Sequence, residues 1–577
     1  MKVFIAKTAG FCMGVRRAVD AALDAPGNHK APIQTFGPLI HNPQVMKLLE
    51  EKGISVITEI PSKGSGTVLI RAHGVPPEIK QGLIDAGFDV LDATCPRVIK
   101  VQSIIQRHAR KNYASIIIGD SDHPEVVGLL GYAEGKGCVV NGIEALDRLP
   151  AFDKAILVAQ TTQSTVFFNE VKNWVSQKFP HYEIFNTICD STERRQAEVK
   201  QLAQSVDVVI AVGGHNSGNT QRLAEIARLT GKPVYHVETE SELDMQALAS
   251  AKSIGIAAGA STPNWIISKV YRALETLPFQ KGKRWKKAIF AIQRYLLLTN
   301  FYVSVGAGCL CFACTRLLSI RDFLPYVIVS MLYVQSMHTL NHLTGNKEDR
   351  YNDPDRAAFY EKHIFFLTFF ALASGGFGLL TALTMGLGPF LTLFAMSLLG
   401  LSYNLKIIPK FLTGGKIRRI KDVPGSKTAL IAIAWGVVTS IFPVLAVSGK
   451  ISIGAILVFV WSTGMVFVRS AFFDMLDMQG DRIVGKETIP LLIGEKRARR
   501  VLKRLLTVLS VLLFLSSAIG FLPSLGFFLT LSPLLMLLML TSYERVYLLP
   551  GVRLEFLVET HFIVSGVIAV LWSLFSV

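Results

Sequence analysis

The hydrophobic residues follow two different patterns along the chain. Up to about residue 280 they form short runs, each followed by a polar or glycine-containing turn and then a stretch of helical periodicity. These runs include VFIA, TVLIRA, SIIIGD, AILVAQT and VVIAVGG. The alternation of strand-like runs and helical stretches predicts an α/β domain with mostly parallel sheets over residues 1–282.

The remainder, residues 283–577, contains long apolar runs that predict an all-α membrane domain. About nine of these segments are long enough to span, or nearly span, a bilayer. They lie near residues 292–314, 322–340, 364–385, 387–405, 428–447, 451–473, 503–521, 525–541 and 560–577.

The loops between these segments differ sharply in charge. Loops 341–363, 406–427 and 474–502 are long and rich in Lys and Arg, whereas the turns near 386–388, 448–450 and 522–524 are short and carry at most one charge. The positive-inside rule places the Lys- and Arg-rich loops in the cytoplasm. We therefore expect a multi-pass protein of the inner membrane whose N-terminal domain is cytoplasmic.

The composition agrees with this division. The chain has 577 residues, 50% of them hydrophobic, and a net charge of +17, most of which lies after residue 282. This surplus favours contact with anionic lipid or a phosphate substrate over nucleic acid, because no basic patch interleaved with aromatic residues accompanies it. The N-terminal residues read as a strand rather than a signal peptide, so the seven cysteines are expected to be metal ligands or free thiols.

Six turns of the N-terminal domain carry a cysteine or a histidine of chemical interest. In three of them a cysteine precedes a stretch with basic residues, and in three others a histidine lies near a proline. In chain order they are Cys12, His41, His73, Cys95, His123 and Cys189. The regular spacing predicts three similar α/β units around one centre.

Three thiolates that converge from three units are able to hold a 4Fe–4S cluster in which one iron lacks a protein ligand. Buried structural cysteines remain an alternative on spacing alone. Zinc is a further alternative, although structural zinc sites usually use closely paired ligands and no CxxC pair occurs here. Cys138 has no matching basic stretch, so we expect it to be an ordinary thiol.

Two further turns suit a phosphate group. Residues 213–220 read GGHNSGNT and residues 258–263 read AGASTP, and each turn follows an apolar strand and precedes a helix. Backbone N–H groups and Ser or Asn side chains at a helix start form an anion site. An ordinary capped helix is the alternative for either turn alone.

Together these motifs resemble the 4-hydroxy-3-methylbut-2-enyl diphosphate reductase family over residues 1 to about 280. They are AGFCMGVRRAV, GPLIHNPQV, RAHGVPP, DATCPRV, GDSDHPEVVG, AQTTQS, CDSTERRQ, GGHNSGNT and AGASTP. The resemblance implies reductive dehydroxylation of an allylic diphosphate to isopentenyl and dimethylallyl diphosphate. A cluster-bearing sensor without turnover is the competing interpretation of this half.

The resemblance also assigns roles to individual residues. It implies that Cys12, Cys95 and Cys189 ligate the 4Fe–4S cluster, that Glu125 delivers protons, and that Thr161 and Thr162 contact the substrate near the cluster. The diphosphate should be bound by His41, His73, His123, Ser217, Gly218, Asn219 and Ser261. Gly218 departs from the family, which usually has serine there, and offers only its backbone N–H. The sequence has no flavin or nicotinamide fingerprint, so an external electron donor of the ferredoxin or flavodoxin type is expected.

The membrane half carries carboxylates in its long loops. Asp474, Asp477 and Asp481 are spaced by three and four residues, which places them on one side of a helix end, where they are able to share Mg²⁺. A solvated loop is the alternative, but charges this close to apolar spans are costly unless they are functional.

This half resembles the UbiA-type intramembrane prenyltransferases. The three aspartates and the following GKETIP match well, and Lys406 also matches. An earlier motif matches in part, with Asn341 and Asp349 present but Gly345 at a position that is usually acidic. The resemblance implies Mg²⁺-dependent binding of a prenyl diphosphate and prenyl transfer. The alternative is a membrane anchor or prenyl-lipid binding module with degenerate metal sites.

Overall fold

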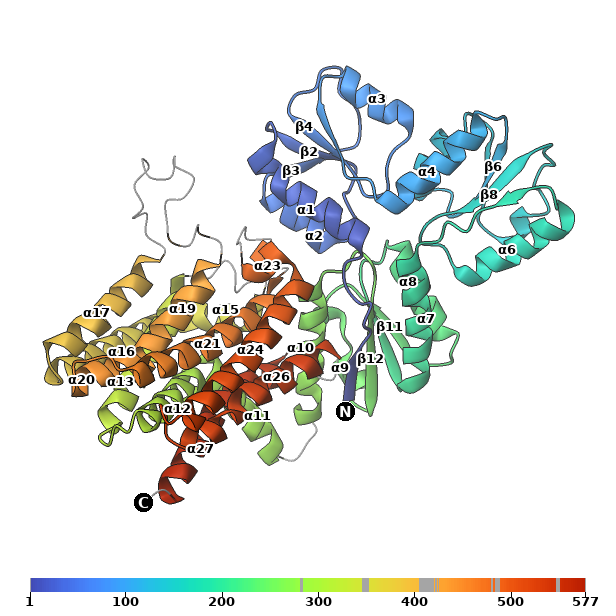
Figure 1. Ribbon diagram of the computed structural model, residues 1–577. Coiled ribbons are helices and arrows are strands. Elements are labelled where there is room, and N and C mark those ends of the chain that lie inside the picture. Colours follow the sequence, from blue (N-terminus) through green and yellow to red (C-terminus); the bar gives the residue numbers. More distant parts are fainter. Residues whose placement is uncertain are drawn as a thin grey trace. The chain divides into compact units, whose positions relative to one another are not determined.

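The chain forms two compact units in the computed structural model, Met1–Lys281 and Gly282–Val577 (Figure 1). The structure describes residues 2–280, 284–344, 352–403, 420, 423, 425–478, 481–482, 488–545 and 551–575.

The first unit contains three four-stranded sheets, and all their strand pairs are parallel. The first sheet has the order β1 (Lys2–Ile5), β12 (Ser253–Ala258), β10 (Val208–Val212), β11 (Val234–Val237). The second has the order β3 (Ile54–Ile57), β2 (Ile33–Phe36), β4 (Thr67–Ile70), β5 (Asp89–Asp92). The third has the order β7 (Gly137–Val140), β6 (Ala114–Ile118), β8 (Ala155–Ala159), β9 (Glu183–Ile184). The predicted α/β class with parallel sheets is confirmed.

The inner strands are buried along their whole length, because helices cover both faces of a parallel sheet. Every residue of β4, β6, β8 and β10 is buried, which explains their uninterrupted apolar runs. The helices of this unit are α1 (Met13–Asn28), α2 (Pro43–Glu51), α3 (Pro77–Asp85), α4 (Pro96–Ala109), α5 (Pro124–Gly131), α6 (Thr165–Lys178), α7 (Asp190–Ser205), α8 (Gly218–Arg228), α9 (Met245–Leu248) and α10 (Asn264–Gln280).

The second unit is helical throughout its described residues. Its main helices are α11 (Arg284–Leu298), α12 (Phe301–Leu317), α13 (Leu324–Thr344), α15 (Pro354–Lys362), α16 (Ile364–Thr384), α17 (Leu387–Ser402), α19 (Ser426–Gly436), α20 (Phe442–Val447), α21 (Ile453–Leu476), α23 (Ile489–Ile493), α24 (Glu495–Ala518), α25 (Leu525–Leu529), α26 (Leu531–Glu544) and α27 (Val552–Phe575).

Among the described residues, six helical segments are long and apolar enough to cross a membrane. A seventh span results if α11 and α12, which meet at a bend of 74°, are taken as one. The helical class is confirmed, whereas the count of nine spans stays a prediction. Two of the nine predicted segments are not among the six. The helix α17 is too short, with 16 residues, and α13 is less apolar because it carries polar side chains such as Gln335 and His338.

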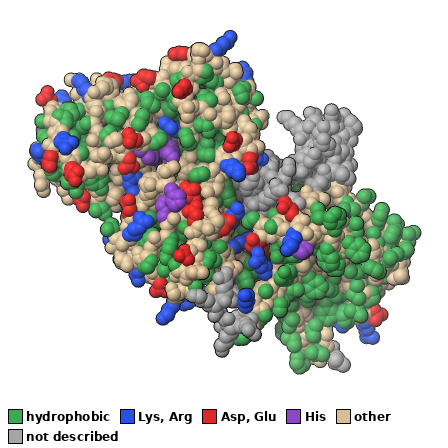
Figure 2. Space-filling view, turned by 180° about the vertical axis from the view of Figure 1, so that it is seen from behind, with side chains coloured by type: hydrophobic (Ala, Val, Ile, Leu, Met, Phe, Trp, Pro, Cys, Tyr) green, Lys and Arg blue, Asp and Glu red, His purple; other side chains and the backbone are tan. Residues whose placement is uncertain are grey.

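The outer surface of this unit is strongly apolar. Figure 2 shows hydrophobic side chains over most of its visible face, in contrast with the mixed, charged surface of the α/β unit. Large side chains such as Phe365, Phe369 and Leu538 are exposed. An apolar surface of this extent is costly in water and suits lipid. The second unit is therefore a multi-pass membrane domain.

Candidate functional site

The three predicted cluster cysteines occupy equivalent positions in the first unit. Cys12, Cys95 and Cys189 are the N-cap residues of α1, α4 and α7. They follow β1, β5 and β9, which are edge strands of the three different sheets. The peptide N–H groups at a helix start carry a partial positive charge, which favours the thiolate form of a cysteine. Each α/β unit thus presents one thiol suited to metal binding.

A cycle of arginine side chains joins the three cysteine turns. Arg17 of α1 donates to the carbonyl oxygen of Thr94, directly before Cys95 (3.1 Å). Arg97 of α4 pairs with Asp190, directly after Cys189 (2.5 Å). The third member is Arg195 of α7, which donates to the carbonyl oxygen of Gly10, two residues before Cys12 (2.6 Å). Each turn is therefore fixed by an arginine from a neighbouring unit.

The cysteine turns also pack tightly against one another. Gly14, in the first turn of α1, has no room for a side chain, because a Cβ atom there would overlap Sγ of Cys95. Burial raises the pKa of the Cys95 thiol, and the neighbouring thiols of Cys12 and Cys189 raise it further. A group of neighbouring thiols suits a metal cluster, whose positive charge deprotonates its thiol ligands.

One cavity brings together every residue that the sequence assigned to the N-terminal site. Its lining includes Cys12, Cys95, Cys189, His41, His73, His123, Glu125, Thr161, Thr162, Ser217, Gly218, Asn219 and Ser261. Cys138 lies instead on β7, where burial raises the pKa of its thiol to about 11. The cavity therefore combines a group of thiols with polar side chains of the kinds that bind a phosphate ester.

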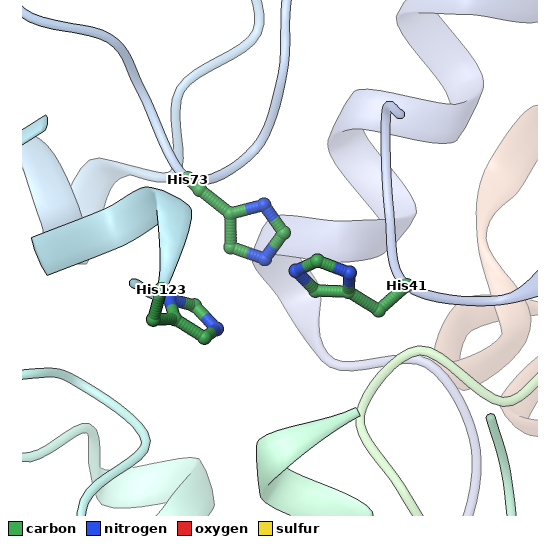
Figure 3. A group of neighbouring side chains, drawn as sticks. All are labelled: His41, His73 and His123. Carbon is green, nitrogen blue, oxygen red and sulfur yellow. The ribbon is translucent and has the colours of Figure 1, made fainter. Parts of the chain in front are cut away.

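The side chains of His41, His73 and His123 converge from three loops (Figure 3). Their ring centroids are 4.6 to 5.4 Å apart. Nε2 of His41 and Nδ1 of His73 are buried and have no hydrogen-bond partner among the described residues. Nδ1 of His123 accepts the N–H of Glu125 (3.1 Å), so the neutral ring carries its proton on Nε2. These nitrogens are ready to bind a ligand.

The surroundings of the three histidines favour an anion over a metal ion, although their ligand atoms lie within 4.8 Å of one another. Burial lowers the pKa of His123 to about 4, and that of His73 also falls well below its ordinary value. The positive charge of Arg71 contributes to the lowered pKa of both histidines. His123 is also the N-cap of α5, whose first N–H groups are partially positive. Neutral histidine donors in a positive field match a diphosphate.

The turn before α8 supplies further hydrogen-bond donors. Ser217 is the N-cap of α8, and the Nδ2 atom of Asn219 is buried without a hydrogen-bond partner among the described residues. From the second predicted turn, Ser261 donates to the carbonyl oxygen of His41 (3.1 Å), which joins that turn to the histidines. These groups extend the anion site beyond the imidazole rings.

Gly218, at a position where the resembled family usually has serine, lies beside the side chains of Arg222 and Asp120. A Cβ atom at Gly218 would lie 3.2 Å from Nη1 of Arg222 and 3.6 Å from Oδ2 of Asp120. Arg222 forms an ion pair with Asp120 (2.6 Å) and donates to the carbonyl oxygen of Thr162 (3.2 Å). A serine side chain at position 218 would therefore make a close steric contact with Arg222 of this ion pair.

Glu125 is almost fully buried, with an exposed fraction of 1%. The backbone N–H of Thr161 donates to Oε1 (2.6 Å), and the hydroxyl of Thr161 forms a hydrogen bond with Oε2 (2.9 Å). Burial raises the pKa of Glu125 to about 7, although the bonds from Thr161 oppose part of the rise. At neutral pH this carboxyl group is therefore poised between its acid and base forms, as a general acid requires.

Sequence reasoning missed the residues that hold these groups in place. Arg17, Arg97 and Arg195 were noticed only as basic residues after each cysteine, and Arg222 and Asp120 were not singled out. Asp120 belongs to the GDSDHP motif, and Arg222 lies two residues after the end of GGHNSGNT. Their positions in or beside motifs were the available signal. Their partners lie on distant segments, so the contacts themselves could not be read from the sequence.

Replacing Arg195 with methionine is expected to destabilise the first unit. Its side chain is 4% exposed and donates to two carbonyl groups, those of Gly10 and Ala258. Each buried carbonyl left unpaired costs about 1–3 kcal/mol. Thermal unfolding of the full-length protein measures the loss, and the neighbouring, exposed Arg194→Met is the control. Equal stability of the two variants would contradict the role given to Arg195.

In the second unit, the predicted aspartates lie at the C-terminal end of α21. Asp474 is hydrogen-bonded to Thr428 of α19, and Asp477 is the C-cap residue of α21. Asp481 is buried and accepts a hydrogen bond from Asn352, which precedes α15 (3.1 Å). These carboxylates are thus gathered at one end of the helical unit.

Of the partially matched motif, only Asn341 lies within the described residues, near the C-terminal end of α13. Asp349 and Lys406, as well as Gly345, lie outside the described residues. The same unit contains a buried ion pair between Arg469 of α21 and Glu559 of α27. Charges buried among membrane-spanning helices are costly and mark candidate functional sites.

The fold and the cavity define the chain as an α/β protein with a cavity lined by cysteines and histidines, joined to a multi-pass membrane domain. Residues 3–275 match the family model described as LytB protein, and residues 301–553 match the UbiA prenyltransferase family. The N-terminal half belongs to the LytB family, and the C-terminal half is similar to the UbiA prenyltransferase family.

Curated relatives match the N-terminal half. The 4-hydroxy-3-methylbut-2-enyl diphosphate reductase of Oleidesulfovibrio alaskensis is 46% identical over 285 residues, which cover 48% of this chain and 100% of the relative. The reductase of the same name from Opitutus terrae is 42% identical over 289 residues, with the same coverage. Over the C-terminal half, the structure of a UbiA homolog from Archaeoglobus fulgidus bound to GPP and Mg²⁺ is 13% identical. It covers 48% of this chain and 99% of its own, with a TM-score of 0.35.

Proposed function

We propose that the first unit catalyses the reductive dehydroxylation of 4-hydroxy-3-methylbut-2-enyl diphosphate. The substrate takes up two electrons and two protons, its allylic C–O bond breaks, and water leaves. The products are isopentenyl diphosphate and dimethylallyl diphosphate. The observation that carries this proposal is the single cavity in which three cysteines, three histidines and Glu125 line the same space.

Cys12, Cys95 and Cys189 would hold a 4Fe–4S cluster in this cavity. The residues fit that cofactor, because three thiols from three helix starts converge and, among the described residues, no fourth cysteine lines the cavity. When bound, the cluster supplies the electrons that reduce the substrate.

The polar residues bind the diphosphate. The neutral rings of His41, His73 and His123 provide N–H donors. Ser217 and Asn219, the backbone N–H of Gly218, and Ser261 provide further donors in the same cavity. Hydrogen bonds to a charged phosphate are about twice as strong as neutral ones, so together they fix the substrate in one orientation.

Glu125 delivers a proton through Thr161. Oε1 of Glu125 accepts a backbone N–H, so the acidic proton resides on Oε2, which faces the Thr161 hydroxyl. When Oε2 is protonated, it donates to that hydroxyl, which then has its own proton to pass on. Thr162 lines the cavity beside Thr161 and contacts the substrate end near the cluster.

Genetic complementation tests this function. A bacterium that depends on this reaction, and whose own reductase is repressed, should grow when the full-length chain is supplied. The same strain should not grow with the Cys189→Ser variant expressed at the same level. Failure of the wild-type chain to restore growth, despite normal expression and cluster content, would argue against the proposal.

We further propose that the second unit transfers prenyl groups in the inner membrane and that the first unit lies in the cytoplasm. The Lys- and Arg-rich loops support this orientation. Asp474, Asp477 and Asp481 would bind Mg²⁺ with the prenyl diphosphate, assisted by Asn341, Asp349 and Lys406. Magnesium binds through few carboxylates plus substrate phosphates, so a partial first motif is compatible with activity.

Replacing Asp477 or Asp481 with alanine is expected to abolish this second activity. Membranes are incubated with Mg²⁺, a labelled prenyl diphosphate and extracted lipids or quinone precursors, and label in a lipid product is measured. Asp322→Ala, an exposed residue in the turn before α13, is the control. Absence of Mg²⁺-dependent binding, with both aspartate variants behaving like wild type, would favour a membrane anchor or prenyl-lipid binding module.

A further inference from the structure

The three cysteine turns lie close to the surface of the first unit. The residue that directly follows each cysteine is exposed: these are Met13, Pro96 and Asp190. Met13 has an exposed fraction of 66%, unusually high for an apolar side chain, and Ile99 of α4 is exposed to 40%. The turns of Cys12 and Cys95 therefore carry exposed apolar groups, whereas an aspartate follows Cys189.

The helices that follow the three cysteines also carry exposed cations. Arg16 of α1, Lys100 of α4 and Arg194 of α7 are exposed and lie four or five residues after Cys12, Cys95 and Cys189. Each is thus about one helical turn from a cysteine, because an α-helix has 3.6 residues per turn. The arginine cycle holds the starts of α1, α4 and α7 within reach of one another. We call Met13, Arg16, Ile99, Lys100 and Arg194 the cysteine face.

The proposed reaction makes the cysteine face a natural entry point for electrons. Each turnover needs two electrons, and the sequence contains no flavin or nicotinamide fingerprint that would supply them internally. Because the rate of electron transfer falls steeply with distance, a donor must approach the surface closest to the cysteine turns. Transient electron-transfer complexes have small interfaces, in which complementary charges steer the partners together.

We propose that the cysteine face is the docking surface for a small, acidic electron-carrier protein. This inference rests on the proposed reductase function. Two reduced carriers each deliver one electron, and two protons are taken up as the allylic hydroxyl leaves as water. Arg16, Lys100 and Arg194 attract the acidic surface of the carrier, while Met13 and Ile99 form the apolar centre of the contact.

A triple charge reversal tests the docking surface in the full-length protein. The test variant is Arg16→Glu/Lys100→Glu/Arg194→Glu. The control is Lys111→Glu/Lys172→Glu/Lys252→Glu, which reverses three exposed cations elsewhere on the first unit. Arg17 and Arg97 are left unchanged, because they hold the cysteine turns together.

With a reduced acidic ferredoxin as donor, kcat/KM for the ferredoxin should fall at least about 10-fold in the test variant. The control should stay near wild type, and added salt should slow the wild type towards the rate of the test variant. With reduced methyl viologen, which needs no docking surface, all three proteins should turn over at equal rates. Direct binding of the ferredoxin should weaken in parallel.

Two results would overturn the docking surface: unchanged ferredoxin-dependent rates in the test variant, or equal losses with ferredoxin and with methyl viologen. A wild-type protein that is inactive with both donors would instead refute the proposed reductase function. The two failures are thus distinguishable.

Discussion

Replacing Cys12, Cys95 or Cys189 with serine is expected to abolish the iron–sulfur cluster and the reductase activity. Each cysteine supplies the only thiol of its turn, and in the part of the chain that the structure describes no other cysteine lines the cavity to take its place. A serine hydroxyl at the same helix start is a far poorer ligand, because iron–sulfur clusters are held by thiolates. Iron and sulfide content, the visible absorption of anaerobically purified protein and the turnover rate measure the loss.

Cys138→Ser is the matched control for these variants. Cys138 belongs to the same unit and is half-buried, but it lies on β7 and does not line the cavity. We expect it to keep both cluster and activity. Full activity after the loss of any one of Cys12, Cys95 and Cys189 would contradict the cluster assignment.

The Glu125→Gln variant is expected to keep the cluster and substrate affinity but to lose about 10²–10⁴-fold in turnover, the usual contribution of general acid catalysis. Glutamine preserves the shape of the side chain but has no acidic proton. Glu78→Gln is the matched control, because Glu78 has the same position in α3 as Glu125 in α5 but is exposed. A Glu125→Gln variant within about threefold of wild type would rule out this residue as the proton source.

The pH dependence provides an independent readout for Glu125. Its pKa is raised to about 7, so the protonated form that donates dominates below pH 7 and is lost above it. The wild-type rate should therefore decrease as the pH rises through about 7. The Glu125→Gln variant should lack this decrease, because its amide does not titrate. A decrease of the same shape in the variant would assign the titration to another group.

The sequence predicted the α/β class because the inner strands of parallel sheets are continuous apolar runs. It did not predict how the strands divide among sheets. β1 and β12 are the first and last strands of the unit in the sequence, yet they pair with each other. Such a pairing depends on contacts between residues far apart in the chain. The residues predicted for the N-terminal site line one cavity, because they stand in motifs at strand ends, where parallel sheets gather functional groups.

The supporting contacts of the site were not predictable in the same way. Arg195 reaches Gly10 across 185 positions in the sequence, and Arg222 reaches Asp120 across 102. Which partner a long side chain reaches is set by tertiary packing and leaves no periodicity in the chain. The number of membrane spans in the second half was also harder to predict. Apolar runs alone do not separate a full span from a short helix such as α17 or a polar-lined helix such as α13.

The central claim is that the cysteine-lined cavity of this chain reduces an allylic diphosphate. Anaerobic turnover by the full-length, cluster-loaded protein tests it most directly, with 4-hydroxy-3-methylbut-2-enyl diphosphate as substrate and reduced methyl viologen as donor. We predict formation of isopentenyl and dimethylallyl diphosphate, with two electrons consumed for each product molecule. No product above the level of the Cys189→Ser variant, from a preparation whose cluster is intact, would contradict the account.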